Sequence, residues 1–372
     1  MENFSIIKKL LKIDWLLIIM LILLVSIGCL ALYSAAGGDW NPWANRHFQR
    51  SILGFSLAFV IAVTDIKIIY KYAWVPFIIS IILLLILYLT SNSGVNRWLD
   101  LGLIKIQPSE IAKISIILGL ARYFHDINIR DYGKILYSLL ALLIALPIII
   151  LTVIQPDLGT AVMQILIVAV LIFLAGLRIW LLTLSVVGVI ASLPLIWFNL
   201  HDYQKQRILT HLDPSLDSLG AGYHINQSKI ALGSGSIFGK GFLNGSQSHL
   251  DFLPEKQTDF IFTMIGEEFG LAGALFVLMI FVLLMLYCTI ISFLQSSQFG
   301  RLLCSGIVFM LFSYVFVNVG MVSGLLPVVG APLPLISYGG SSMLTIFISF
   351  GIILSASIHR FDKLEIKSNK YI

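Results

Sequence analysis

Asp259 is the acidic side chain best placed for chemistry, because it stands where a long polar segment meets an apolar one. We expect a helix to begin near this residue, so that its carboxylate faces water at a helix N-terminus. A carboxylate that is partly desolvated there can take a proton from a hydroxyl group as a general base. The alternative is that Asp259 only caps the helix. Glu267 and Glu268, a little further along, fit structural roles as well as functional ones.

Glu110 and Lys113 form a second candidate, within the sequence QPSEIAK. Pro108 suits the first turn of a helix, and the spacing i, i+3 then places both charges on one helix face, where they can pair. Charged groups in a membrane span are costly unless they pair or face water, and they are functional candidates by default. Two interpretations stay open: a neutralised pair that locks helices together, or the lining of a polar cavity that holds a substrate.

Arg97 and Trp98 are adjacent in a polar connection and could bind a phosphate and a sugar face respectively. Trp98 is equally well explained as an anchor at a membrane interface. Asp157, in the sequence QPDLGT, is expected in the first turn of another helix, where the helix dipole favours an acid. We therefore expect Asp157 to act as a helix cap.

The elements that must position these residues are membrane helices. Hydrophobic residues make up 58% of the 372 and charged residues 12%, with a mean hydropathy of +0.96. Soluble domains carry about 25% charged residues, so a water-soluble protein is excluded. Apolar stretches of about 18 residues or more recur along the chain, each long enough to cross a hydrocarbon core of ~30 Å. The net charge of +5 does not indicate nucleic-acid binding, because the basic residues gather at one membrane face.

The sequence predicts an all-α polytopic membrane protein with about ten transmembrane helices, in a single integral membrane domain over residues 1–372. Two connections are long. The segment 199–258 is rich in Gly and polar residues and is expected as one large loop, and the segment 323–340 has too many prolines for a regular spanning helix. The helices are expected near 14–34, 47–64, 72–90, 108–124, 135–153, 159–176, 179–198, 259–291, 300–322 and 341–358.

The distribution of Lys and Arg predicts the orientation, because basic residues are retained on the cytoplasmic side. With the N-terminus inside, fourteen of them fall in cytoplasmic segments and four in the short outer loops. Both termini are then cytoplasmic and the segment 199–258 is extracytoplasmic. All the candidate residues named above lie toward the outer face, so we expect the function there.

Several motifs in one order resemble the SEDS family (shape, elongation, division and sporulation proteins) over essentially the entire chain. They are RWLDLG, QPSEIAK, QPDLGTA, FLPEKQTDFIFTMIGEE (252–268) and NVGMVSGLLPVVGAPLPLISYGGSS (318–342). The sequence GSQSHLDFLPE and the short N-terminus resemble the RodA branch more than the FtsW branch. Ala331 departs from the family signature, which usually has a branched aliphatic residue there; this changes bulk and puts no chemistry in doubt.

The resemblance implies a peptidoglycan glycosyltransferase at the outer face of the cytoplasmic membrane, active in cell elongation. Such an enzyme polymerises lipid II, an undecaprenyl-pyrophosphate-linked disaccharide pentapeptide, into β-1,4 glycan strands. The family's catalytic acid maps onto Asp259, and its polar pair and RW motif map onto Glu110, Lys113, Arg97 and Trp98. The implied partners are lipid II, membrane lipids, a class B penicillin-binding transpeptidase and other proteins of the elongation complex.

The chemistry of such a reaction fits these residues. The leaving group is a pyrophosphate, so cations must stabilise its developing negative charge. Arg97 and Lys113 are candidates, with Arg207 and Lys240 as further donors from the long polar segment. No cofactor is certain, and a divalent cation, Mg²⁺ or Mn²⁺, is left open. One base and one departing diphosphate suggest a single displacement that inverts an α-linked donor into a β-linked product.

Two other classes of function remain as alternatives. A transporter that flips lipid II would also use many helices, a buried ion pair and a proline-broken segment. A non-catalytic scaffold of the elongation complex is the second. Polymerisation of lipid II by purified protein in detergent separates an enzyme from both, because there is then no bilayer to flip across.

Overall fold

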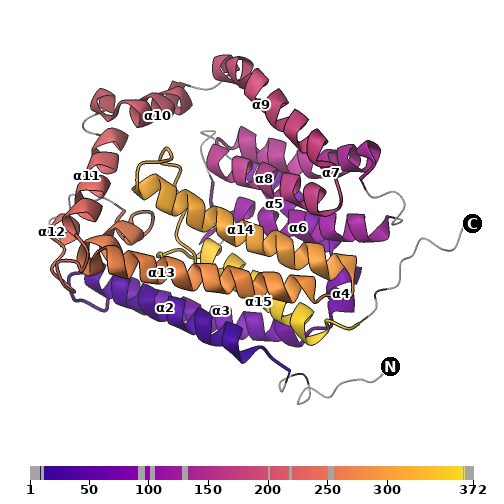
Figure 1. Cartoon of the computed structure of the whole chain (residues 1–372), viewed down its shortest axis with the longest axis horizontal. Helices are drawn as coiled ribbons and strands as arrows, with labels where there is room; N and C mark the ends of the chain where they lie inside the picture. The colour runs from indigo at the N-terminus through magenta and orange to yellow at the C-terminus, as the bar shows by residue number, and fades with distance from the viewer. Residues whose placement is uncertain are drawn as a thin grey trace, which may run out of the picture.

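The computed structural model describes residues 9, 12–90, 97–100, 105–127, 133–199, 202–217, 220–249, 255–362 and 364, and most of them are helical. The helices form a bundle in which α2, α3, α13, α14 and α15 run alongside one another (Figure 1). The elements along the chain are α2 (Trp15–Ala35), α3 (Trp43–Val63), α4 (Ile66–Lys71), α5 (Trp74–Thr90), β1 (Leu99–Asp100), β2 (Lys105–Ile106), α6 (Pro108–Asp126), α7 (Ile135–Ile154), α8 (Leu158–Leu174), α9 (Ile179–Asn199), α10 (Asp202–Leu212), the 3₁₀ turn η2 (Pro214–Asp217), α11 (Ala221–Ser234), α12 (Ser246–His249), α13 (Ile261–Phe293), α14 (Gln298–Val322) and α15 (Ser341–Ile358).

Each of the ten segments predicted as a transmembrane helix is a helix in the structure. Within the described residues, five helices are both long and apolar enough to cross a membrane: α2, α7, α13, α14 and α15. Two shorter ones, α5 and α8, are also apolar. These helices make the chain an integral membrane protein, and the full count of ten spans stays a prediction.

The segment 199–258 is not a single loop, contrary to the prediction. It contains α10, η2, α11 and α12, which arch over one end of the bundle in Figure 1. The helix α11 packs on α13 and α14 through Ser228, whose hydroxyl lies 2.8 Å from the Thr263 hydroxyl and donates to the Val322 carbonyl. Tertiary contacts therefore hold a helix whose glycines and polar residues gave no clear apolar periodicity.

Small residues let α3 and α15 pack closely and parallel to each other. A Cβ added at Gly54 would lie 2.1 Å from the Phe347 ring, and one added at Gly351 would lie 2.8 Å from the Ala58 carbonyl oxygen. The first halves of both helices therefore meet at one end of the bundle and their last turns meet at the other. This fixes two opposite faces of the molecule, one at each end of these helices.

The helix α13 is interrupted at Gly270, which has φ 67° and ψ −165°. The two following amides instead donate to the segment 199–258, Leu271 to the Ser236 carbonyl at 2.9 Å and Ala272 to the Ile237 carbonyl at 3.0 Å. A Cβ at Gly270 would lie 2.4 Å from the Gly239 nitrogen, so only glycine fits. The single span predicted over 259–291 is thus two helical segments, which explains its excess length.

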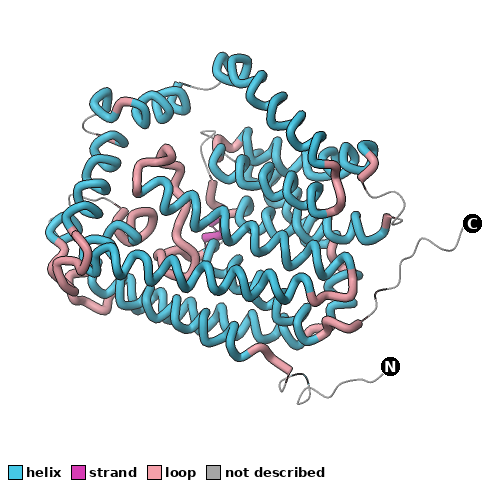
Figure 2. The backbone as a smooth tube through the Cα atoms, viewed as in Figure 1, coloured by secondary structure: helices cyan, strands magenta, loops and turns pink. Residues whose placement is uncertain are grey.

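The connection between α14 and α15 contains no regular helix, as its prolines predict. In Figure 2 it is drawn as loop from the end of α14 to the start of α15. Tyr338 of this loop donates its amide hydrogen to the Gln257 carbonyl at 2.8 Å. The Ser337 hydroxyl donates to the Thr258 carbonyl at 2.6 Å. The loop is therefore fastened to the segment that precedes α13.

Candidate functional site

A polar cavity of about 300 Å³ lies where the loop 323–340 meets the segment before α13. Side chains from α6, from the start of α8 and from α14 complete its wall. It is lined by Arg97, Trp98, Gln107, Glu110, Lys113, Asp157, Gly159, Thr160, Met163, Glu255, Thr258, Asp259, Tyr314, Val329, Gly330, Ala331, Pro332, Tyr338, Gly339 and Ser342. Five of the seven predicted site residues are in this wall, although they are spread over more than 160 positions of the sequence.

Asp259 lies at the edge of this cavity, in the turn before α13. The Asn318 side chain of α14 fixes its backbone by donating to the Asp259 carbonyl at 2.9 Å and to the Ala331 carbonyl at 2.7 Å. One carboxylate oxygen faces Gly330, where an added Cβ would lie 3.4 Å away. Asn318 was not identified from the sequence, although a polar amide in an apolar span is a signal for such a role.

The environment of Asp259 makes it a better base than an ordinary aspartate. Burial, and then the nearby Glu255 carboxylate, raise its pKa from 3.8 to about 6. A base of that pKa remains mostly deprotonated at neutral pH and yet binds a proton more strongly than a solvated aspartate. The residue at the N-cap of α13 is Phe260, so Asp259 lies outside the helix and the capping alternative is not supported.

Glu110 and Lys113 pair as predicted, at 2.8 Å between Lys113 Nζ and Glu110 Oε1. Both are buried, with side-chain exposures of 1% for Lys113 and 6% for Glu110. The sequence reading missed a third member, Tyr314 of α14. The Tyr314 hydroxyl accepts from Lys113 Nζ and donates to Glu110 Oε2. The pair thus joins two helices and also lines the cavity. That it contacts a substrate there stays a prediction.

Asp157 is not a helix cap, contrary to the prediction. It occupies the N-cap position of α8, but its side chain makes no capping hydrogen bond. Its carboxylate accepts from Gln107 Nε2 at 3.1 Å and from the Ser109 hydroxyl at 3.2 Å, and it lies 3.9 Å from Arg97 Nη1. The carboxylate therefore contacts Gln107, Ser109 and Arg97 in place of the backbone amides of α8. Asp157 is therefore part of the cavity wall.

Arg97 and Trp98 both line the cavity, with Trp98 45% exposed. A second, apolar groove of about 310 Å³ adjoins the cavity and shares Arg97, Asp157, Gly159, Met163 and Val329 with it. It runs between α8, α10 and the end of α14, and its wall contains Val162, Leu166, Ile208, Val317 and Leu326. The predicted residue Arg207 lines this groove and not the polar cavity.

Lys240 is not among the residues that line the cavity or the groove. Its Nζ lies 2.8 Å from the Glu267 carboxylate, whose side chain is fully buried and needs a counter-charge. Glu268 accepts a hydrogen bond from the Ser34 hydroxyl of α2. Lys240 and Glu267 therefore hold the segment 199–258 on the bundle, and Glu268 joins α13 to α2. These contacts fit the structural alternative for the two glutamates.

Comparison with known proteins identifies the family. The sequence profile of the cell cycle protein family that comprises FtsW, RodA and SpoVE matches residues 10–362. The peptidoglycan glycosyltransferase MrdB of Escherichia coli is 42% identical over 360 residues, covering 94% of each chain. A probable peptidoglycan glycosyltransferase FtsW of Wigglesworthia glossinidia brevipalpis is 34% identical over 380 residues, covering 98% of this chain and 97% of its own.

Solved structures share the fold. A chain of a peptidoglycan synthase complex that coordinates polymerization and crosslinking superposes with a TM-score of 0.80 at 29% identity, covering 94% of this chain and 99% of that one. The rod shape determining protein RodA of Thermus thermophilus gives a TM-score of 0.69 at 26% identity, covering 94% and 98%. The fold and the site together define a polytopic membrane protein with a polar cavity at one face. The chain belongs to the FtsW, RodA and SpoVE family, which confirms the resemblance seen in its motifs.

Proposed function

We propose that this peptidoglycan glycosyltransferase of the RodA type polymerises lipid II into β-1,4 glycan strands, with Asp259 as the catalytic base. The observation that carries the proposal is the half-buried Asp259 carboxylate, whose pKa is raised to about 6. It lies in the wall of a polar cavity of about 300 Å³ that also contains Arg97 and Lys113. The carboxylate takes the proton of the acceptor hydroxyl as that oxygen attacks the anomeric carbon of the donor. The bond from that carbon to the pyrophosphate breaks in the same displacement, which inverts the donor's configuration.

The polar cavity and the adjoining apolar groove suit the two parts of a lipid-linked sugar. The polar cavity accepts the saccharide and pyrophosphate, and the apolar groove accepts the first part of an undecaprenyl chain. Arg97 lies in the wall of both, where the pyrophosphate joins the two parts. We assign to Arg97 the stabilisation of the departing pyrophosphate, with Arg207 as a further cation along the groove.

A divalent cation, Mg²⁺ or Mn²⁺, stays part of the proposal as an option. Glu255 and Asp259 would hold it, because their like charges are close enough for Glu255 to raise the pKa of Asp259. Carboxylate oxygens are the ligands that these cations prefer. Such an ion would supply charge stabilisation for the pyrophosphate.

The proposal includes the topology and the setting of the enzyme. Ten helices span the cytoplasmic membrane, both termini are cytoplasmic, and the cavity opens at the outer face. Lys and Arg are enriched in the connections at the opposite end of the bundle, which supports this orientation. A class B penicillin-binding transpeptidase is the proposed partner, because one structural relative comes from a complex that couples polymerization to crosslinking.

The test of this function is the rate of glycan synthesis from lipid II by purified Asp259→Asn protein in detergent. Asparagine keeps the shape and hydrogen-bonding capacity but removes the basicity, so the rate should fall on the order of 10²–10⁴-fold. The matched control is Asp39→Asn, the same change at an exposed aspartate outside the cavity. Asp259→Asn protein that makes long strands at the wild-type rate would remove Asp259 from the mechanism. Wild-type protein that makes no glycan, yet moves lipid II between leaflets of a vesicle, would favour the flippase.

A further inference from the structure

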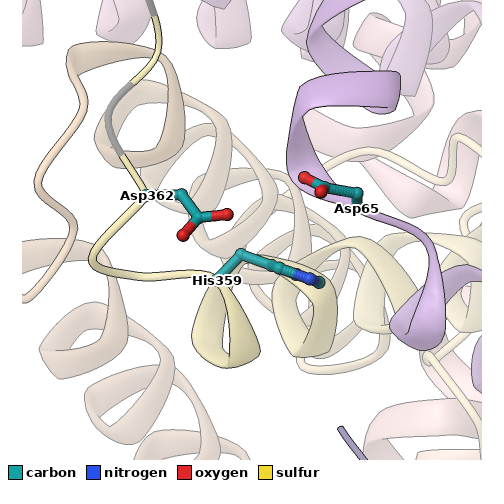
Figure 3. A group of neighbouring side chains, drawn as sticks. All are labelled: Asp65, His359 and Asp362. Carbon is teal, nitrogen blue, oxygen red and sulfur yellow. The ribbon is translucent and has the colours of Figure 1, made fainter. Parts of the chain in front are cut away.

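A second cluster of metal-ligating side chains lies at the opposite face of the bundle from the cavity. It consists of Asp65, in the junction between α3 and α4, with His359 and Asp362 after α15. A ring nitrogen of His359 and one oxygen of each carboxylate all lie within 4.8 Å of one another. Figure 3 shows the three side chains facing a common space, with the imidazole pointing from the end of α15 toward Asp65.

His359 is arranged as a ligand and not as a packing residue. Only 6% of the residue is exposed, and its Nδ1 lies 2.9 Å from the Ser355 carbonyl, to which it can only donate. This contact leaves the lone pair on Nε2, which is buried and has no hydrogen-bond partner among the residues that the structure describes. A histidine whose second nitrogen is fixed by a backbone carbonyl is the usual arrangement of a metal ligand. A buried nitrogen without a partner is otherwise costly.

The two carboxylates have capacity to spare for a cation. Asp65 uses Oδ1 to accept from the Lys67 amide at 2.9 Å, as the N-cap of α4. Its other oxygen makes no such bond within the described part of the chain. The Asp362 carboxylate lies 3.9 Å from Lys67 Nζ, in a pair whose side chains are 33% and 50% exposed. Such an exposed pair is weak, so an incoming cation would displace the lysine readily.

We propose that Asp65, His359 and Asp362 form a binding site for a divalent transition-metal ion of the zinc class, separate from the outer cavity. One imidazole with two carboxylates suits Zn²⁺ or Fe²⁺ better than Mg²⁺ or Ca²⁺, which prefer oxygen ligands alone. Tetrahedral ligands at zinc lie roughly 3.3–3.5 Å apart, so the three donors would move inward by about 1 Å, with water as the fourth ligand. The site fastens the junction of α3 and α4 to the end of α15, where the Ser355 hydroxyl already donates to the Thr64 carbonyl.

The test is titration of the purified full-length protein, carrying no oligohistidine tag, with Zn²⁺ by calorimetry and with Co²⁺ by visible absorption. We expect one equivalent of Zn²⁺ per chain, a higher thermal unfolding temperature with Zn²⁺ than with Mg²⁺, and a Co²⁺ band typical of a site with a nitrogen ligand. His359→Gln should weaken Zn²⁺ binding by more than about tenfold, since even second-shell changes cost 10–100-fold. Asp65→Asn keeps the capping oxygen and should weaken binding as well.

His211→Gln is the matched control, because His211 lies on α10, far from this cluster in the fold. It should leave the Zn²⁺ affinity unchanged. Absence of stoichiometric Zn²⁺ binding to the wild-type protein would overturn the proposal. So would binding that survives both His359→Gln and Asp362→Asn. If one variant fails to fold, the other substitutions at the cluster still decide the question.

Discussion

At the scale of single residues, the site depends on two aspartates whose surroundings differ from those of a solvated or helix-capping aspartate. Asp259 is partly desolvated beside Glu255, and Asp157 turns away from its own helix toward Gln107 and Arg97. The partners of Asp157 come from distant parts of the chain, whereas Glu255 is close to Asp259 in the sequence and the burial of Asp259 comes from its tertiary surroundings. The chemistry of these residues therefore reflects tertiary contacts as well as the local sequence.

The pH dependence of the reaction follows from the raised pKa of Asp259. A general base works only when deprotonated, so the rate should fall as the pH drops through about 6. Glu255→Gln removes the neighbouring negative charge and keeps an oxygen that can accept from the Thr258 hydroxyl. The pKa of Asp259 should then decrease, although burial still raises it, and the acidic limb of the rate profile should shift to lower pH. A profile of glycan synthesis between pH 5 and 8 measures this, and an unshifted limb would show that Glu255 does not act on the base.

At the scale of elements, polar contacts within the bundle join helices that apolar packing alone would allow to slide. The Glu110, Lys113 and Tyr314 cluster joins α6 to α14, and Asn318 of α14 holds the turn before α13. The break at Gly270 lets the segment 199–258 donate hydrogen bonds to the backbone of α13 and accept hydrogen bonds from it. These hydrogen bonds hold the residues of the cavity wall in fixed positions.

The link between α6 and α14 can be tested by a double-mutant cycle at Glu110 and Lys113. Removing one partner leaves a buried charge unpaired and should cost about 3–5 kcal/mol of stability, while removing both should cost less. Thermal unfolding in detergent of Glu110→Ala, Lys113→Ala and the double variant measures this. Tyr314→Phe is a control that removes only the hydroxyl that both charges contact.

Two other outcomes of this cycle have distinct meanings. Variants that all fold normally yet lose polymerisation would assign the pair to substrate binding. Variants that fold normally with full activity would contradict both roles. Because the three residues share one hydrogen-bonded cluster, their effects should not add.

At the scale of the whole molecule, the fold separates two faces. The cavity, the start of α15 and the helices of the segment 199–258 lie at one face, and the Asp65, His359 and Asp362 cluster lies at the other. The membrane orientation decides which of them meets lipid-linked sugar and which meets the cytoplasm.

Single cysteines test this orientation, in a chain whose buried Cys29, Cys288 and Cys304 are replaced. Asn226→Cys, on the exposed side of α11, should react with an impermeant thiol reagent in intact spheroplasts. Ser296→Cys, exposed in the turn between α13 and α14, should react only after the membrane is permeabilised. The reverse pattern would place the cavity in the cytoplasm and rule out the proposed polymerisation at the outer face.

The sequence by itself determined the class of protein, the positions of ten helices and the pairing of Glu110 with Lys113. These are local or compositional properties: apolar length sets a span, and i, i+3 spacing sets a helix face. The junction of polar and apolar sequence indicated Asp259 as the residue of chemical interest, and the family motifs mapped the catalytic acid onto it. Its elevated pKa did not follow from the TDF sequence, because the main cause is burial, which tertiary packing sets.

Only the tertiary structure decided what surrounds these residues. It made Asp157 part of the cavity wall, gave the charged pair Tyr314 as a third member, and placed Lys240 with Glu267. It also folded helices into the segment 199–258, whose glycine-rich composition indicated a loop. The physical reason is common to all of these. A buried polar group is satisfied by whichever partner the packing brings within reach. The Asp157 partners Gln107 and Ser109, the Tyr314 partner Glu110 and the Lys240 partner Glu267 all lie more than twenty residues away in the sequence.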